Sequence, residues 1–63
     1  MTDREKGMLF TAYARLQYDI DKQIECLEKN TDEVIRENAR RIIDCDMFAQ
    51  EKIAEMFWEE TMR

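Results

Sequence analysis

Carboxylates are the most numerous side chains in this sequence that could take part in chemistry. Asp and Glu supply 15 of the 63 residues, and one group of them recurs at helical spacing. This group, the acidic patch, consists of Glu51, Glu55, Glu59 and Glu60. Residues four apart lie on the same face of a helix, where like charges repel each other weakly. The spacing is typical of a solvated face or of a contact for a basic partner, and it does not indicate a paired general acid and base.

The groups on which catalysis and metal binding most often depend are absent or isolated. The chain contains no His, which is the commonest general base and metal ligand. Cys26 and Cys45 are too few and too far apart in sequence for a zinc site. There is no glycine-rich phosphate loop and no Gly-x-Ser-x-Gly turn. We therefore expect a protein that is not an enzyme and that uses no metal and no cofactor.

Methionine, aromatic and arginine side chains are the remaining candidates for binding. Methionine and aromatic residues are enriched at protein interfaces, and the chain ends with a group of them: Met47, Met56, Phe57, Trp58 and Met62. Three arginines, Arg36, Arg40 and Arg41, could contact phosphate or RNA, but Glu33, Glu37 and Asp44 surround them. The net charge of −5 also argues against nucleic acid. A protein partner is therefore favoured.

Two helices, separated by a break near the middle of the chain, must position these candidates. Only the segment 28–33 (EKNTDE) carries stop and start signals together. Asn30 can end a helix in the left-handed conformation or cap the next one with its side chain. At the start of the chain, Thr2 and Glu5 have the spacing of a capping box.

These signals predict an all-α protein. We expect one helix over about 3–29, a turn at about 29–32 and a second helix over about 32–61. A link this short makes the helices antiparallel neighbours, so residues 1–63 form a single helical-hairpin domain.

Apolar residues in both predicted helices recur with the 3.6-residue period of a helix. The first stripe is Leu9, Tyr13, Leu16, Ile20, Ile24 and Leu27, and the second is Ile35, Ala39, Ile42, Cys45, Ala49, Ile53 and Met56. If the numbers of facing residues sum to about 61, Gly7 lies opposite Ala54, where two small residues allow a close approach of the helices. The same register places Asp46 level with Arg15, which predicts an ion pair within the hairpin.

The hairpin also sets the distance between the two cysteines. Cys26 faces the region of Ile35, and Cys45 lies about ten residues, or about 15 Å, further along. A disulfide requires Cα atoms within about 7 Å. We therefore expect buried free thiols, with an intermolecular disulfide as the alternative.

A second apolar row on the second helix cannot share the seam of the hairpin. Its members, with Phe57 at the edge, form the predicted interface: Ile43, Met47, Ala54, Phe57 and Trp58. About 100° or more of helix separates most of this row from Ile42, so it must meet something else. A second copy of the hairpin would give an antiparallel four-helix bundle. Whether the row serves self-association or a different partner stays open.

Several short matches are similar to the Rop family of plasmid copy-number regulators. They are Met1-Thr2, Glu5-Lys6, Leu9, Ala12 and Asp32-Glu33. The resemblance implies a hairpin dimer that binds RNA. Two differences set this chain apart: the core seam of that family falls on Arg15 and Lys22, and Asp19, Asp21 and Glu25 occupy much of the first helix.

We therefore predict a small homodimeric protein that binds another protein as a regulator, inhibitor or adaptor, of the accessory kind found on phages and plasmids. One alternative is a Rop-like RNA-binding dimer, and a second is a structural co-chaperone subunit that is stable only in a hetero-complex. The sequence has no apolar run of membrane-spanning length and no signal peptide, so we expect a cytoplasmic location without membrane attachment.

Overall fold

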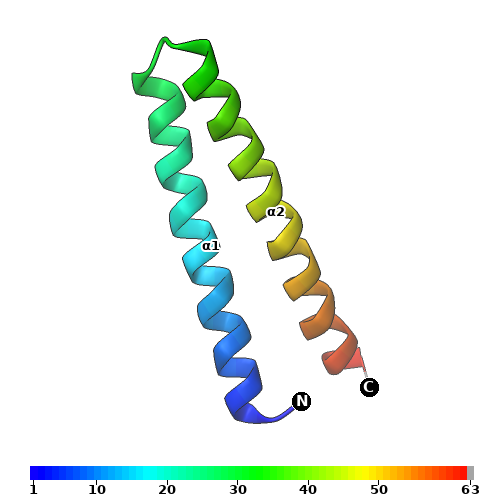
Figure 1. Ribbon diagram of the computed structural model, residues 1–63. Coiled ribbons are helices and arrows are strands. Elements are labelled where there is room, and N and C mark those ends of the chain that lie inside the picture. Colours follow the sequence, from blue (N-terminus) through cyan, green and yellow to red (C-terminus); the bar gives the residue numbers. More distant parts are fainter. Residues whose placement is uncertain (63) are drawn as a thin grey trace.

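The computed structural model describes the backbone of residues 1–62 and the side chains of residues 1–60. Two helices, α1 (Asp3–Lys29) and α2 (Glu33–Met62), lie antiparallel and side by side along their whole length (Figure 1). The side chain of Met62, which the sequence places among the binding candidates, lies outside the described residues. The predicted all-α hairpin is confirmed for this part of the chain.

The start of α1 is fixed by reciprocal hydrogen bonds. The Oγ1 of Thr2 accepts from the backbone N–H of Glu5 at 3.1 Å, and the backbone N–H of Thr2 donates to Glu5 Oε1 at 3.1 Å. This is the predicted capping box, which satisfies two N–H groups that the first helical turn leaves free. The hydrogen bonds with Thr2 also lower the pKa of the Glu5 carboxyl.

The turn between the helices is built differently from our expectation. Asn30 is extended (φ −107°, ψ 140°), and its side-chain amide donates to the carbonyl of Cys26 at 3.0 Å. Asn30 therefore does not adopt the left-handed conformation that the sequence allows for it, and its backbone N–H donates to the same Cys26 carbonyl at 3.0 Å. Asp32, rather than Asn30, caps α2, since its Oδ1 accepts from the N–H of Val34 at 2.9 Å. Arg36 then closes the turn by donating to the carbonyls of Leu27 and Asn30.

The seam between the helices is rotated relative to the predicted apolar stripe of α2. Six of the buried and half-buried side chains of α2 recur at spacings of three and four residues and form the seam: Ala39, Ile43, Asp46, Gln50, Ile53 and Phe57. The other half-buried side chains of α2 are Arg36, Arg40, Ala49 and Glu60. Residues expected at the seam are instead exposed, namely Ile35, Ile42, Cys45 and Met56. The prediction followed hydrophobicity and so missed Gln50, which is buried in the seam, whereas Asp46 was expected at the contact between the helices and does lie there.

The α1 side of the seam is closer to the expected stripe. Leu9, Leu16 and Leu27 are half-buried and Ile20 is buried, whereas Tyr13 and Ile24 are about 40% exposed (39% and 43%). Among the described side chains, Ile20 and Ala39 are the only apolar ones that are buried. The hairpin alone therefore leaves most of its large apolar side chains exposed.

Two predicted contacts across the hairpin are wrong. Asp46 meets Asp19 and not Arg15, because the observed register sums to about 65 at this level and not to 61. Gly7 does not face Ala54 closely, since a Cβ atom built on Gly7 would have no neighbour within 4 Å. Gly7 lies on the outer surface of α1, where it permits no close approach of the helices.

Candidate interaction surfaces

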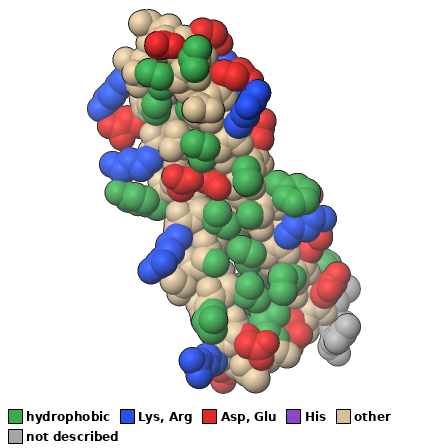
Figure 2. Space-filling view, in the orientation of Figure 1, with side chains coloured by type: hydrophobic (Ala, Val, Ile, Leu, Met, Phe, Trp, Pro, Cys, Tyr) green, Lys and Arg blue, Asp and Glu red, His purple; other side chains and the backbone are tan. Residues whose placement is uncertain are grey.

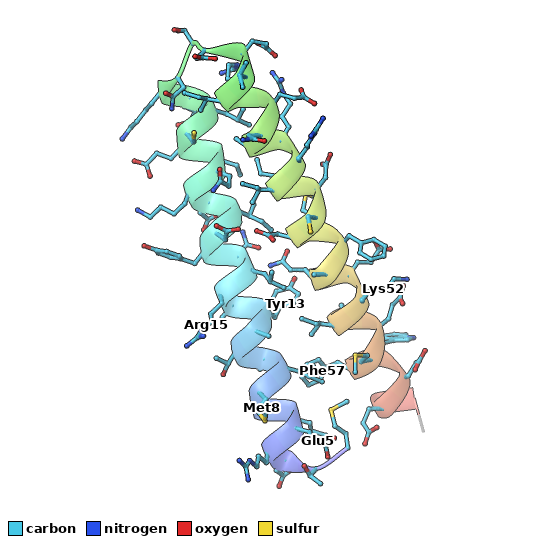
Figure 3. All side chains as sticks on the ribbon, viewed as in Figure 1. Glu5, Met8, Tyr13, Arg15, Lys52 and Phe57 are labelled. Atoms are coloured by element: carbon cyan, nitrogen blue, oxygen red, sulfur yellow. The ribbon has the colours of Figure 1, made fainter. Side chains whose placement is uncertain are left out.

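An aromatic groove runs along one side of the seam near the open ends of the helices. It consists of two adjoining hollows. The first is lined by Phe10, Tyr13, Ala54, Phe57 and Trp58, and the second by Tyr13, Asp44, Met47, Phe48, Gln50, Glu51 and Ala54. The hollows share Tyr13 and Ala54, so they form one continuous apolar groove to which both helices contribute. Figure 3 labels Tyr13 of α1 and Phe57 of α2, whose ring lies between the two helices.

The structure brings together most of the predicted interface. Ala54, Phe57 and Trp58 line the first hollow and Met47 lines the second. Ile43 is the exception: it is half-buried within the seam, so its assignment to the outward row is wrong. The opposite wall of the groove is made by Phe10 and Tyr13 of α1. The sequence places Tyr13 in the seam and leaves open whether Phe10 joins this contact or stays exposed. Phe10 departs from the apolar stripe of α1, and that departure was the available signal.

The exposed area of the hairpin is larger than a compact chain of its mass should have. The chain exposes 5179 Å², whereas a compact 7.7 kDa monomer would expose about 4300 Å². Its radius of gyration is 14.5 Å, compared with about 11 Å for a compact domain of this length. The excess of roughly 850 Å² is close to the ~800 Å² that each partner buries in a standard protein interface.

Carboxylates border the aromatic groove, and two of the four members of the predicted acidic patch are paired within the hairpin. Glu51 lines the groove together with Asp44, and neither forms an ion pair with another described residue. Glu55 pairs with Lys52 at 3.5 Å, and Glu60 accepts from the N-terminal amine at 2.8 Å. Glu59, the remaining member of the predicted acidic patch, is exposed.

A polar layer crosses the middle of the seam. Gln50 is only 8% exposed, and its side-chain amide donates to the Tyr13 carbonyl at 3.3 Å and to Gln17 Oε1 at 3.0 Å. One turn further on, the Asp19 carboxyl raises the pKa of Asp46, chiefly by a shared hydrogen bond, and burial adds to the shift. Two carboxyls can share a hydrogen bond only if one is protonated. When both are ionised, the buried Oδ2 of Asp46 has no hydrogen-bond donor among the described residues.

The opposite side of the seam carries a second apolar row with basic residues along it. Helical periodicity, counted from the buried Ile20 and Gln50, places nine residues on this basic-edged face: Arg4, Met8, Arg15 and Lys22 of α1 and Ile35, Ile42, Cys45, Ala49 and Met56 of α2. Figure 2 shows it: hydrophobic side chains gather along the junction of the helices, and Lys and Arg line the α1 edge. In the same orientation, Figure 3 labels Met8 and Arg15 on α1.

The arginines that the sequence offered for RNA are mostly engaged inside the hairpin. Arg36 binds the turn carbonyls, and Arg40 pairs with Glu33 at 2.8 Å and with Glu37 at 3.3 Å. The Arg40 guanidinium lowers the pKa of the Glu33 carboxyl accordingly. Arg41 lies beside Glu37 on the outer surface of α2, in a shallow hollow.

The structure also bears on the expectations for the cysteines, for metal binding and for membrane attachment. Both cysteines are free; Cys26 is half-buried, but Cys45 is exposed, so the expectation of a buried thiol at Cys45 is wrong. Over the described residues, no three Cys, Asp or Glu side chains cluster as a metal ion requires. Neither helix, as far as it is described, has a stretch long and apolar enough to cross a membrane.

No protein family, no curated protein and no solved structure matches this chain.

Proposed function

We propose that the chain is a small, non-enzymatic, homodimeric protein-interaction module. In this proposal, the aromatic groove of one copy packs against the aromatic groove of a second copy, which gives an antiparallel four-helix bundle. The dimer then acts as a regulator, inhibitor or adaptor by binding another protein. The observation that carries the proposal is the continuous groove, because both helices supply large apolar side chains to it and Phe10, Met47 and Trp58 are exposed there.

Burial of the groove supplies what the isolated hairpin lacks. Trp58 is 67% exposed and Phe10 is 70% exposed, which is unusual for side chains of this size in a stable monomer. A large aromatic side chain buries about 150–250 Å², so covering the exposed part of Trp58 contributes on the order of 3 kcal/mol per copy at 25 cal/mol per Å². Chains this short seldom reach useful stability without such an addition.

The aromatic groove is better suited to self-association than the basic-edged face. On the basic-edged face, α1 contributes mainly charged side chains, whereas it contributes Phe10 and Tyr13 to the groove. Two-fold association requires the same patch on both copies to be complementary to itself. An apolar groove satisfies that requirement more easily than a basic edge, which would face its own like charges.

The fluorescence of Trp58 tests this proposal, because it is the only Trp in the chain and it lines the groove. We expect its emission to be blue-shifted at high protein concentration and to move to longer wavelength on dilution. Met47→Glu should give the long-wavelength emission at every concentration, since it places a charge in the groove. Folding, followed by circular dichroism, should weaken together with association, as in other small obligate dimers.

Val34→Glu is the matched control for this experiment. Val34 is 76% exposed and lies in a hollow on the outer surface of α2, away from the groove. The same apolar-to-Glu change there should leave the concentration dependence unaltered. If wild type and Met47→Glu have identical, concentration-independent emission, the groove is not a self-association surface.

The binding of another protein can be tested by affinity capture from a lysate of the native host. Capture is carried out with and without nuclease, at low and at high salt. A protein that is retained after nuclease treatment supports the proposal. Retention of RNA alone, with the steep salt dependence of phosphate contacts, would instead support the RNA-binding alternative.

A further inference from the structure

We propose that the basic-edged face is the partner-binding surface, and that it binds an acidic amphipathic helix of another protein. This inference rests on the proposed function and specifies its partner. Helical periodicity places the aromatic groove and the basic-edged face on opposite sides of the seam, so a dimer formed through the grooves leaves both basic-edged faces outward. Figure 2 shows the basic-edged face. Each dimer would then offer two equivalent sites.

Arginines without partners in the hairpin supply the charge of this face. Arg4 and Arg15 form no ion pair with any described residue, whereas Lys22 and Lys29 both approach Glu25, at 4.0 Å and 2.5 Å. Arg4 and Arg15 are therefore two guanidinium groups on one edge of α1 that no described carboxylate pairs with. Guanidinium groups bind carboxylates in a bidentate manner, which favours an acidic partner.

A shallow hollow on α1 lies between these arginines. It is lined by Arg4, Gly7, Met8, Thr11, Ala12 and Arg15. Small side chains keep it open, and nothing lies within 4 Å of the position of a Cβ on Gly7. Eleven residues separate the two arginines, about 16 Å along the helix axis. Acidic residues three turns apart on one face of a partner helix can therefore reach both.

The apolar row on α2 favours a protein helix over a nucleic acid. Ile42 is 38% exposed and Met56 is 45% exposed, with the smaller Ala49 between them at intervals of seven residues. Residues at such intervals form a nearly straight row on a helix, and a second helix with leucines at matching spacing can cover it. A phosphate backbone would leave this row in contact with water and would gain only from the arginines.

Asp19 and Asp46 restrict which acidic helix can bind. Their carboxyls lie half-buried in the seam between the arginine edge and the apolar row. The partner must therefore place its acidic residues over the α1 edge and uncharged residues over the middle. This requirement distinguishes a helix with one acidic edge from a chain that is acidic on all sides.

A fluorescently labelled synthetic helix, about three heptads long, tests the proposal on the full-length protein. The probe carries leucines at the core positions and glutamates along one edge; a second probe has lysines in place of the glutamates, and a third is an RNA hairpin. We expect saturable binding of the glutamate peptide alone, measured by fluorescence anisotropy. Arg15→Glu and Ile42→Ala should each weaken it by about tenfold or more, and Arg41→Glu, on the outer surface of α2, should not.

Protection of a thiol gives a readout that requires no variant. Cys45 is exposed and lies one turn after Ile42 on this face, so the bound glutamate peptide should slow its alkylation, as located by peptide mapping. Three results would overturn the proposal. They are equal binding of the two peptides, binding of the RNA hairpin that Arg15→Glu abolishes, and the absence of both binding and thiol protection with the glutamate peptide. Sedimentation of the same samples separates this failure from loss of the dimer, which would contradict the proposed function instead.

Discussion

Replacing Asp46 with Asn should stabilise the protein at neutral pH. In the wild type, two half-buried carboxyls, Asp19 and Asp46, face each other in the seam, and Asp46 Oδ2 lacks a donor when both are ionised. The Asn amide would donate to the Asp19 carboxylate without adding a charge. A hydrogen bond to a charged group contributes about 1.5–3 kcal/mol, and partial exposure reduces this, so we expect a gain of about 1 kcal/mol at pH 7. In a domain of this size, that raises the melting temperature by about 4–8 °C.

The pH dependence gives the sign of the effect independently. The folded-state pKa of Asp46 is raised above its ordinary value of 3.8, so the protonated form is favoured on folding. The stability that Asp46 contributes is therefore complete below pH 3.8 and is lost as the pH rises through the raised pKa. Glu5, Glu25 and Glu33 have lowered pKa values, and their contribution is lost only as the pH falls below 4.5. Above pH 4.5 the contributions of these three carboxyls are complete, so a further loss of stability with rising pH is due to Asp46.

Urea unfolding at fixed protein concentration and several pH values measures this effect, since the stability of a dimer depends on concentration. The wild type should lose stability as the pH rises, and Asp46→Asn should remove most of that slope. Asp21→Asn is the control, because Asp21 is exposed and the Asn oxygen can still accept from Gln17; it should change stability by less than about 0.5 kcal/mol. A wild type that gains stability as the pH rises above 4.5, or an Asp46→Asn variant less stable than wild type at pH 7, would refute the reasoning.

The remaining predictions concern helix stability and packing. Gly7→Ala should stabilise the protein by about 1 kcal/mol in thermal or urea unfolding, since Gly7 is exposed inside α1 and a methyl group there meets nothing; destabilisation would show a close contact at this position. Ile20→Ala should cost about 2–4 kcal/mol, as truncation of a buried side chain does, whereas Ile42→Ala should cost about 1 kcal/mol or less because Ile42 is 38% exposed. Equal losses at the two positions would show that the seam is drawn incorrectly.

The sequence predicts the helices of this protein better than the way they face each other. Capping residues act locally, so Thr2 and Glu5 could be read directly, and the break between the helices follows from a few residues around Asn30. The seam depends on pairing across the hairpin. There, Gln50 is buried because Gln17 and the Tyr13 carbonyl accept its hydrogen bonds, a compensation that hydrophobic periodicity does not reveal.

The sequence predicts the candidate surfaces only in part, again because they depend on contacts across the hairpin. The rotation of α2 moves Ile43 into the seam and brings Ile42 out of it, while Met47, Ala54 and Trp58 keep their outward positions. Arg15 was expected to pair with Asp46, and only the register shows that it is free on the basic-edged face. Contacts between distant segments therefore decide which of the exposed residues can bind a partner.

Sedimentation equilibrium of the wild-type protein over a wide concentration range tests the central claim most directly. The chain has a mass of 7.7 kDa, and we predict a species of twice that mass at micromolar concentration and above. Met47→Glu should sediment as a monomer and lose helical signal, and Val34→Glu should sediment as the wild type. A wild-type protein that remains a folded 7.7 kDa monomer throughout would contradict the claim that a second copy fills the aromatic groove.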